Sequence, residues 1–397
     1  SGDISNESGM GTFLTSLDTR PPFLDTGILT PYDTRPSFER DEAMALRCIL
    51  GIDGGGSKCH AILVRDDGKA LGWGESGQKG APDERHRIFG GRGRTYYAIL
   101  KAVVDALGDT DYDDLHIASV TNPLPLDFLL QARPTKIQVH QASEHNSAFA
   151  LAGVNVGVVA LAGTGAVVYG KTRDGRAEYL DGVGPLVGDH GGGYEIGLLA
   201  IRAAAQSGWH GRHKTAIADA VYEACGAKQI DRRGGGLIGY MVGQKDRSEI
   251  AGLAKIVNNA ANAGDQVARR ILQEAAAGIA GTVYDVVDNL KIANETYTLV
   301  GTGSIMTHCH IYWDHFCELV GEFAPKLRPT RSDLPAVVGV ALSAMQEIPG
   351  LNLKAAKKTL FQSTRAMLKA RGKQASSRGA DIGRTDIVGT RLRDPRL

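Results

Sequence analysis

Residues 53–58 combine an acid, three glycines, a serine and a lysine directly after an apolar run, and this combination suits the binding of a phosphorylated ligand. Backbone N–H groups of a glycine turn approach an anion closely, because no side chain stands in the way. The carboxylate of Asp53 is the kind of ligand that a hydrated Mg²⁺ prefers. A second apolar run at 61–64 predicts a β-hairpin around the glycines. The spacing excludes a Walker-type loop, and the strand that follows excludes a dinucleotide fingerprint.

Three more glycine motifs occur further along the chain, at 163–165, 188–193 and 301–304. Each one alone is compatible with an ordinary turn. Residues 156–182, however, repeat the order of residues 47–75, which is strand, glycine turn, strand, Asp-Gly turn and strand. This repetition predicts two related lobes, each built on a β-hairpin.

The elements that position these motifs follow from periodicity and turn residues. Strands are expected at 47–53, 59–65, 70–75, 115–120, 136–140, 156–162, 166–170 and 297–300. Helices are expected at 94–107, from 144 to 153, at 194–206, over most of 213–290, at 309–322 and at 335–345. The run at 263–290 has the apolar spacing of a helix that faces a core.

The composition limits the class of protein. The chain has 397 residues, enough for two domains, and a formal net charge of +1 that gives no reason to expect nucleic acid as a partner. Its five cysteines are scattered, which argues against a zinc ribbon or a disulfide framework. No apolar run reaches the length of a membrane span, and no signal peptide is evident. We therefore expect a cytoplasmic protein without membrane contact.

Two terminal segments differ in composition from the rest. Residues 1–46 are polar and acidic, predict disorder, and carry an Asp-Thr-Arg-Pro repeat at 18–21 and 33–36. The repeat is compatible with a drifted linker or with paired docking of a protein partner. Residues 349–397 form a basic tail, in which 353–371 has the pattern of an amphipathic helix. A solvated tail and contact with an acidic surface or nucleic acid both remain open.

The order of the glycine motifs resembles the BadF/BadG/BcrA/BcrD ATPase family, which includes N-acetylglucosamine kinases. The resemblance rests on Asp53 to Ser57, Ala162 to Gly165, Gly188-Asp189 ahead of a helix, and Gly301 to Ser304, and it spans about 47–348. It implies an α/β fold of two RNase H-like, actin-like ATPase domains with an ATP cleft between them. The expected domains are 47–150 and 151–348, the second with a helical insertion, between the two terminal segments.

The resemblance also implies roles for individual residues, with ATP and Mg²⁺ as cofactors. Asp53 and Asp189 would face the metal through water and the reacting phosphate. The residues implied in ATP binding are Gly54, Gly55, Gly56, Ser57, Lys58, Gly163, Thr164, Gly165, Gly301, Thr302, Gly303 and Ser304. Those implied in substrate binding are Glu144, His145, Asn146, Asp189 and His190.

The sequence departs from the family pattern where a sugar and its proton would be handled. Asn146 stands at the position of the family's general-base Asp, and an amide cannot accept that proton. Glu144 or His145 could serve instead, or both could be exposed polar residues. His190 stands where the family has Glu.

Three functions follow from these observations. The first is an ATP-dependent kinase of an N-acetylglucosamine-like amino sugar or a related hexose, and the second is a regulator or sensor of the same fold with weakened catalysis. The third, an iron–sulfur ATPase activator, is disfavoured because the cysteines form no cluster pattern. A small-molecule sugar is the expected partner, and a homodimer is compatible with the family.

Overall fold

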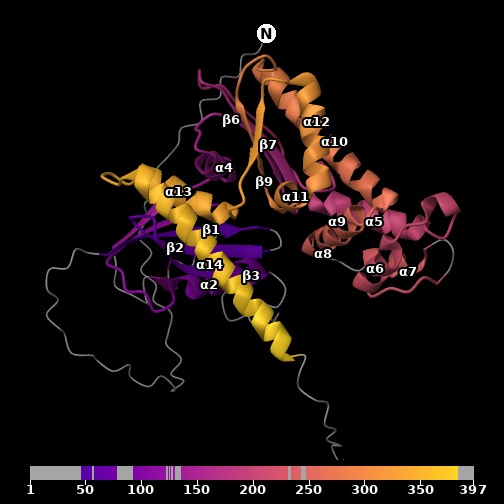
Figure 1. Cartoon of the computed structure of the whole chain (residues 1–397), viewed down its shortest axis with the longest axis horizontal. Helices are drawn as coiled ribbons and strands as arrows, with labels where there is room; N and C mark the ends of the chain where they lie inside the picture. The colour runs from indigo at the N-terminus through magenta and orange to yellow at the C-terminus, as the bar shows by residue number, and fades with distance from the viewer. Residues whose placement is uncertain are drawn as a thin grey trace, which may run out of the picture. The chain divides into compact units, whose positions relative to one another are not determined.

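The computed structural model of the protein describes residues 46–55, 58–77, 93–121, 124, 126, 128–129, 136–230, 234–242 and 247–382 (Figure 1). Three predictions fall outside these ranges. They are the disorder of residues 1–45, the role of the repeats at 18–21 and 33–36, and the ATP contacts of Gly56 and Ser57.

The first sheet contains five strands in the order β3-β2-β1-β4-β5. Their bounds are Arg47–Gly54 for β1, Lys58–Arg65 for β2, Ala70–Gly77 for β3, Asp114–Ser119 for β4 and Lys136–Gln141 for β5. Strands β1, β2 and β3 form an antiparallel meander, while β4 and β5 run parallel to β1. The sheet is therefore mixed, with the hairpin that was predicted around residues 53–58 at its centre.

Side chains of β1 alternate between two helical layers, as the period of two in a strand requires. Leu50 and Ile52 pack against α2 (Gly93–Leu107). Ile49 packs on the other side with α13 (Ala336–Glu347) and α14 (Leu353–Ile382). Helix α13 crosses closely here, because a Cβ on Gly51 would lie 3.0 Å from the carbonyl oxygen of Val337.

The second sheet repeats this arrangement, with strands in the order β10-β9-β6-β7-β8. The bounds are Gly157–Ala162 for β6, Ala166–Lys171 for β7, Ala177–Asp181 for β8, Thr298–Thr302 for β9 and Arg328–Arg331 for β10. The meander β6-β7-β8 is again antiparallel, and β9 runs parallel to β6. The prediction of two related lobes is confirmed by this correspondence.

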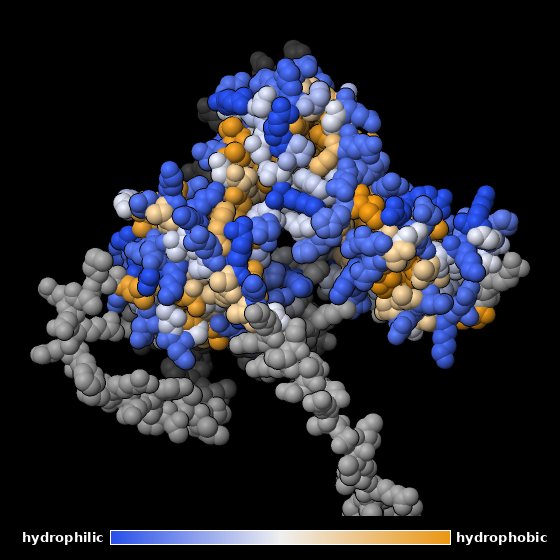
Figure 2. All heavy atoms as spheres, in the orientation of Figure 1, coloured by the Kyte–Doolittle hydropathy of each residue, from blue (hydrophilic) through white to orange (hydrophobic). Residues whose placement is uncertain are grey.

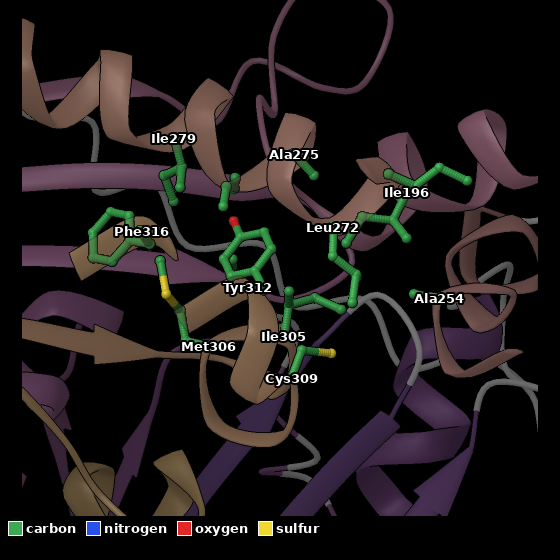
Figure 3. Packing of buried hydrophobic residues seen from close by; sticks show 14 of the residues in the cluster. Ile196, Ala254, Leu272, Ala275, Ile279, Ile305, Met306, Cys309, Tyr312 and Phe316 are labelled. Atoms are coloured by element: carbon green, nitrogen blue, oxygen red, sulfur yellow. The ribbon is translucent and has the colours of Figure 1, made fainter. Parts of the chain in front are cut away.

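Most helices belong with the second sheet (Figure 1). They are α5 (Gly193–Gln206), α6 (Ile217–Ala224), α7 (Gly236–Val242), α8 (Arg247–Gly252), α9 (Ala254–Asn262), α10 (Gln266–Leu290), α11 (Ser304–His308) and α12 (His310–Phe323), with a 3₁₀ turn at Gly211–His213. Figure 3 shows their core, in which Tyr312 and Phe316 of α12 lie among side chains of α10. The hydroxyl of Tyr312 donates a hydrogen bond of 2.9 Å to the carbonyl of Gly191, so this core is tied to a glycine motif.

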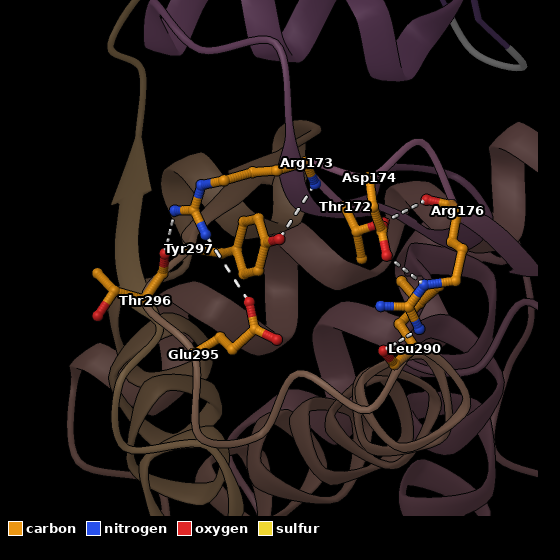
Figure 4. Close-up of polar contacts among 8 residues, drawn as sticks. All are labelled: Thr172, Arg173, Asp174, Arg176, Leu290, Glu295, Thr296 and Tyr297. Carbon is orange, nitrogen blue, oxygen red and sulfur yellow. Dashed lines mark hydrogen bonds and ion pairs between the residues drawn. The ribbon is translucent and has the colours of Figure 1, made fainter.

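The turn between β7 and β8 is fixed by polar contacts (Figure 4). The backbone N–H of Arg173 donates to the Tyr297 hydroxyl at 3.1 Å, and the Arg173 guanidinium lies 4.1 Å from the centre of the Tyr297 ring. Arg176 donates to the carbonyl of Leu290 at 2.7 Å. These contacts join the hairpin to the end of α10 and to the start of β9, so the turn has one defined position.

The basic segment after residue 349 contains a helix that packs into the protein. Ala356 and Leu360 of α14 are buried against the first sheet. Arg365 forms two hydrogen bonds of 2.7 Å with Asp333, and Lys357 donates to the carbonyl of Ala150 at 2.8 Å. At least the first half of α14 thus belongs to the folded body.

The surface of the protein is largely hydrophilic on the face drawn in Figure 2. Apolar residues form small separate patches on this face. Among the helices that the structure describes, none is both long enough and apolar enough to cross a membrane.

Candidate active site

The turn after β1 is held by a threonine from the neighbouring strand. The Thr121 hydroxyl accepts a hydrogen bond from the Gly54 N–H at 3.1 Å and donates one to the Gly54 carbonyl at 2.6 Å. Ser119 fixes Thr121 in turn, because its hydroxyl donates to the Thr121 carbonyl at 2.7 Å and accepts from the Thr121 N–H at 3.0 Å. A Cβ on Gly54 would lie 2.8 Å from the Thr121 hydroxyl oxygen, so glycine is required for this contact.

Asp53 lies at the end of β1 in an environment that disfavours its charge. Burial, followed by the negative charge of Glu144, raises the pKa of Asp53 to about 6. Desolvation also raises the pKa of Glu144, although the residue keeps contact with solvent. Two carboxylates from different elements therefore repel each other here, and a bound cation would relieve the repulsion.

The glycine motif at 163–165 meets the motifs at 188–193 and 301–304. The N–H of Gly193 donates to the Gly163 carbonyl at 2.8 Å, and the N–H of Tyr194 donates to the Thr164 carbonyl at 3.0 Å. These donors belong to the first turn of α5, where backbone N–H groups have no partner within the helix. Gly303 lies against the same loop, since its Cβ would come within 3.0 Å of the Gly163 nitrogen. Three distant parts of the sequence thus form one set of turns.

Asp189 lies among these turns and is 8% exposed. Its carboxylate accepts a hydrogen bond of 3.3 Å from the Gly184 N–H and packs directly against the backbone of Gly165. Its carbonyl accepts from the Gly192 N–H at 3.0 Å. The backbone of Asp189 has φ 60°, a left-handed conformation that is uncommon for a residue with a side chain.

Helix α4 (Glu144–Ala152) brings a carboxylate and an aromatic ring to a neighbouring pocket. The helix starts at Ser143, whose hydroxyl accepts from the Asn146 N–H, and its buried face packs on β6 and β9. The pocket is lined by Glu144, His145, Val159, Leu161, Val167, Tyr169 and Tyr179. The rings of His145 and Tyr169 stack with their centres 3.9 Å apart.

Electrostatics connect this pocket to Asp189. Burial, then the charges of Glu144 and Asp189, raise the pKa of Tyr179. The negative charges of both carboxylates therefore contribute to the raised pKa of the same phenol. His145 responds differently, because burial, and then the positive charge of Lys171, lower its pKa and favour the neutral ring.

Several residues predicted from the sequence have other partners. Lys58 pairs with Glu75 at 3.0 Å across β2 and β3, and both side chains are largely exposed. The ring of His190 bonds Asp181 at 3.0 Å. Asn146 is exposed on α4 and does not line the pocket, whereas Glu144 and His145 do. The ATP contacts of Lys58 and the substrate contacts of His190 remain predictions.

Four residues around the site were not predicted. Ser119 and Thr121 follow an ordinary buried strand, and nothing in their local sequence indicates a contact with Gly54. Tyr179 and Asp181 belong to a short exposed strand and contact the site only because β8 pairs with β7. Long-range pairing of this kind leaves no local pattern in a sequence.

The carboxylates fit Mg²⁺ bound largely through water and phosphate. Asp53 is half-buried beside a second acid, which makes a hard cation favourable there. Among the residues that the structure describes, no three His, Cys, Asp or Glu side chains group as direct metal ligands. Asp53 and Asp189 would thus supply only part of a coordination shell, as Mg²⁺ sites on nucleotides commonly require.

Comparison with known proteins identifies relatives of most of the folded body. Residues 50–344 match the model of the BadF/BadG/BcrA/BcrD ATPase family. The chain is 28% identical over 315 residues to an N-acetylmuramic acid/N-acetylglucosamine kinase of Clostridium acetobutylicum, which covers 76% of this chain and 99% of that protein. It is 26% identical over 327 residues to an N-acetyl-D-glucosamine kinase of Dictyostelium discoideum, with the same coverage.

The fold is also found among solved structures. A proposed N-acetylglucosamine kinase from Chromobacterium violaceum superposes with a TM-score of 0.51 at 20% identity, covering 75% of this chain and 99% of that one. The prediction of an α/β fold with two RNase H-like, actin-like ATPase domains is confirmed.

Proposed function

The chain belongs to the BadF/BadG/BcrA/BcrD ATPase family, and we propose that it is an ATP-dependent kinase of an N-acetylglucosamine-like amino sugar or a related hexose. One observation carries this proposal. The pocket that contains Glu144 is also lined by Leu161 and Val167, which flank the glycine turn at 163–165 on β6 and β7. In this proposal Glu144 would be the proton acceptor beside a phosphate-binding turn, the arrangement that transfer to a hydroxyl requires.

ATP binding is assigned to the glycine turns. In this proposal the turns at residues 54–57 and 163–165 lie against the phosphates, and residues 301–304 contact the adenosine. The N–H groups of Gly54, Gly55 and Gly163 already donate within the protein and shape these turns. Asp53 and Asp189 would hold Mg²⁺ through water, and the bound ion would supply positive charge at the phosphates. The raised pKa of Asp53 supports this assignment, because a carboxylate beside Glu144 gains from a nearby cation.

The chemical step needs an acceptor for one proton. The sugar hydroxyl oxygen forms a bond to the γ-phosphorus, the bond from that phosphorus to the bridging oxygen breaks, and ADP leaves. The hydroxyl proton moves to the carboxylate of Glu144, whose raised pKa strengthens it as a base. Asn146 is the residue at the family's base position, and its amide cannot take this proton.

The pocket has room for about one water molecule as it stands, and in this proposal its walls would contact one face of a pyranose ring at the rim. Tyr169, Tyr179 and His145 present aromatic surfaces, and the floor is formed by aliphatic side chains of β6 and β7. Sugars bind such walls through their apolar faces while their hydroxyls reach polar groups at the rim.

A second function is a sensor that binds ATP and sugar with little turnover. The observation in its favour is the amide of Asn146 in place of a carboxylate. The iron–sulfur activator is not supported, because Cys48, Cys59, Cys225 and Cys309 are buried and only Cys317 is partly exposed, which leaves no set of cysteines to hold a cluster with a partner subunit.

Turnover with a panel of sugars separates the two functions. We expect ADP release from the full chain with Mg·ATP to rise well above background with an N-acylated hexosamine. If nucleotide binds but no hexosamine or hexose stimulates ADP release, and Asn146→Asp creates that activity, the sensor is the correct assignment.

A further inference from the structure

Asp181, the last residue of β8, collects hydrogen bonds from both ends of the loop that precedes α5. Its carboxylate is 5% exposed. It accepts from the N–H of Gly182 at 2.9 Å, from the N–H of His190 at 2.9 Å and from the N–H of Asp189. The His190 ring nitrogen Nδ1 is a fourth partner, at 3.0 Å.

These bonds outweigh the cost of burying the carboxylate. Burial acts against the charged form of Asp181, yet the N–H groups of Asp189 and His190 and the His190 ring hold its pKa below the ordinary value. A buried carboxylate with several donors is a rigid feature, because losing any one contact leaves charge uncompensated.

Two residues of this arrangement have left-handed backbones. Asp181 has φ 71° and Asp189 has φ 60°. A residue with a side chain persists in that conformation when its surroundings fix it. Here each of the two is bonded to the other, since the Asp189 N–H donates to the Asp181 carboxylate.

We propose that Asp181 is a positioning residue that holds Asp189 against the glycine turn at Gly165. The Asp181 bond fixes the Asp189 nitrogen, while Gly192 and Gly184 fix its carbonyl and its carboxylate. Gly188 is required beside it, because a Cβ there would collide with the Asp181 carboxylate. The consequence for Mg²⁺ and phosphate rests on the proposed function, whereas the loop geometry does not.

The variant Asp181→Gly separates positioning from general stability. Glycine adopts φ 71° without strain, so the fold keeps its backbone while the four hydrogen bonds are lost. Lys291→Gly is the matched control. Lys291 ends α10 with φ 57°, and its side chain contacts Asp288 away from the site. Both variants relieve the same kind of backbone strain, and only one removes the contacts to Asp189.

Amide hydrogen exchange of the full chain tests the loop without any ligand. We expect the peptide that covers residues 182–190 to exchange at least tenfold faster in Asp181→Gly than in the wild type, and equally fast in Lys291→Gly. Asp181→Asn keeps one acceptor oxygen and should fall between them. Unchanged exchange in Asp181→Gly would overturn the proposal.

Binding of Mg²⁺ with a non-hydrolysable ATP analogue tests the consequence. Loss of an outer contact that orients a metal-binding carboxylate commonly lowers metal affinity or activity by about 10–100-fold. We expect Asp181→Gly to weaken Mg²⁺-dependent analogue binding and kcat by that factor, with KM for sugar little changed. Equal Mg²⁺-dependent affinity in a variant with faster exchange would overturn the positioning role.

Different results would overturn the proposed kinase function and the proposed positioning role of Asp181. A wild-type protein that binds no nucleotide would overturn the proposed kinase, while the exchange rates of Asp181→Gly and Lys291→Gly would still decide whether Asp181 fixes the loop.

Discussion

The carboxylate of Asp189 packs against the backbone of Gly165, leaving no room for a Cβ at position 165. We therefore expect Gly165→Ala to displace Asp189 and to lower Mg·ATP turnover by about 10–100-fold, the range found when a metal-binding carboxylate is moved. Gly281→Ala on α10 is the control, because a Cβ there meets nothing within 4 Å. Equal kcat/KM for the two variants would show that Asp189 tolerates the shift.

The hydroxyl of Thr121 is expected to determine how well the first glycine turn is formed. Thr121→Ala removes both hydrogen bonds to Gly54 and should destabilise the protein by about 1–3 kcal/mol, because polar groups of the backbone lose their partner. It should also raise the Kd for ATP. Thr121→Ser keeps the hydroxyl and should stay close to the wild type. Denaturant unfolding and nucleotide titration measure the two effects, and equal behaviour of both variants would contradict this role.

The identity of the proton acceptor is tested by removing the carboxylate at position 144 of α4 and introducing one at position 146. Glu144→Gln should lower kcat by about 10²–10⁴-fold, the usual contribution of a positioned base. Asn146→Asp should increase the turnover of Glu144→Gln, because it places a carboxylate at the family's base position. Steady-state ADP release is the measurement. A Glu144→Gln variant with wild-type kcat would exclude Glu144 as the base.

Asp53 is expected to make stability depend on pH and Mg²⁺. Its pKa in the folded protein is about 6, against an ordinary value of 3.8, so the folded state binds this proton more tightly than the unfolded state. The contribution of Asp53 to stability is therefore greatest below about pH 4 and declines as the pH rises to about 6. The Asp53→Asn variant has no carboxylate at this position, so its stability should lack this decline. Above pH 6 the variant should be more stable than the wild type without Mg²⁺.

Thermal melting at several pH values measures this difference. Addition of Mg²⁺ at pH 7 should raise the melting temperature of the wild type more than that of Asp53→Asn. An identical Mg²⁺ response of the two proteins would exclude Asp53 from the metal site.

Helix α14 is expected to be necessary for stability. Leu360 is fully buried against the first sheet, so Leu360→Ala should cost about 2–5 kcal/mol of unfolding free energy. Lys358→Ala on the exposed side of the same helix should change it by no more than about 0.5 kcal/mol. If both variants unfold at the wild-type denaturant concentration, the helix contributes little to the fold.

The sequence was sufficient for the two lobes and most of their elements, but not for the edge strand β10 or for the separate helices α6 to α9. Hairpins around Gly54 and Gly163 were predictable, because glycine turns between apolar runs are local signals. Contacts that depend on strand pairing were not, and these include Thr121 with Gly54 and Asp181 with Asp189. The sequence alone showed that residue 146 departs from the family pattern. It did not predict the burial of Leu360, because the basic charge of that segment suggests a solvated tail.

The two faces of the first sheet are covered by parts of the chain made at very different times. Helix α2 follows the first three strands directly and covers one face, while α13 and α14, which cover the other, are made only after the second sheet and its helices. One apolar face of the first sheet therefore stays uncovered until the second lobe has been synthesised. During translation the first lobe is started before the second lobe but completed after it, and its uncovered apolar face is the surface that a chaperone would bind.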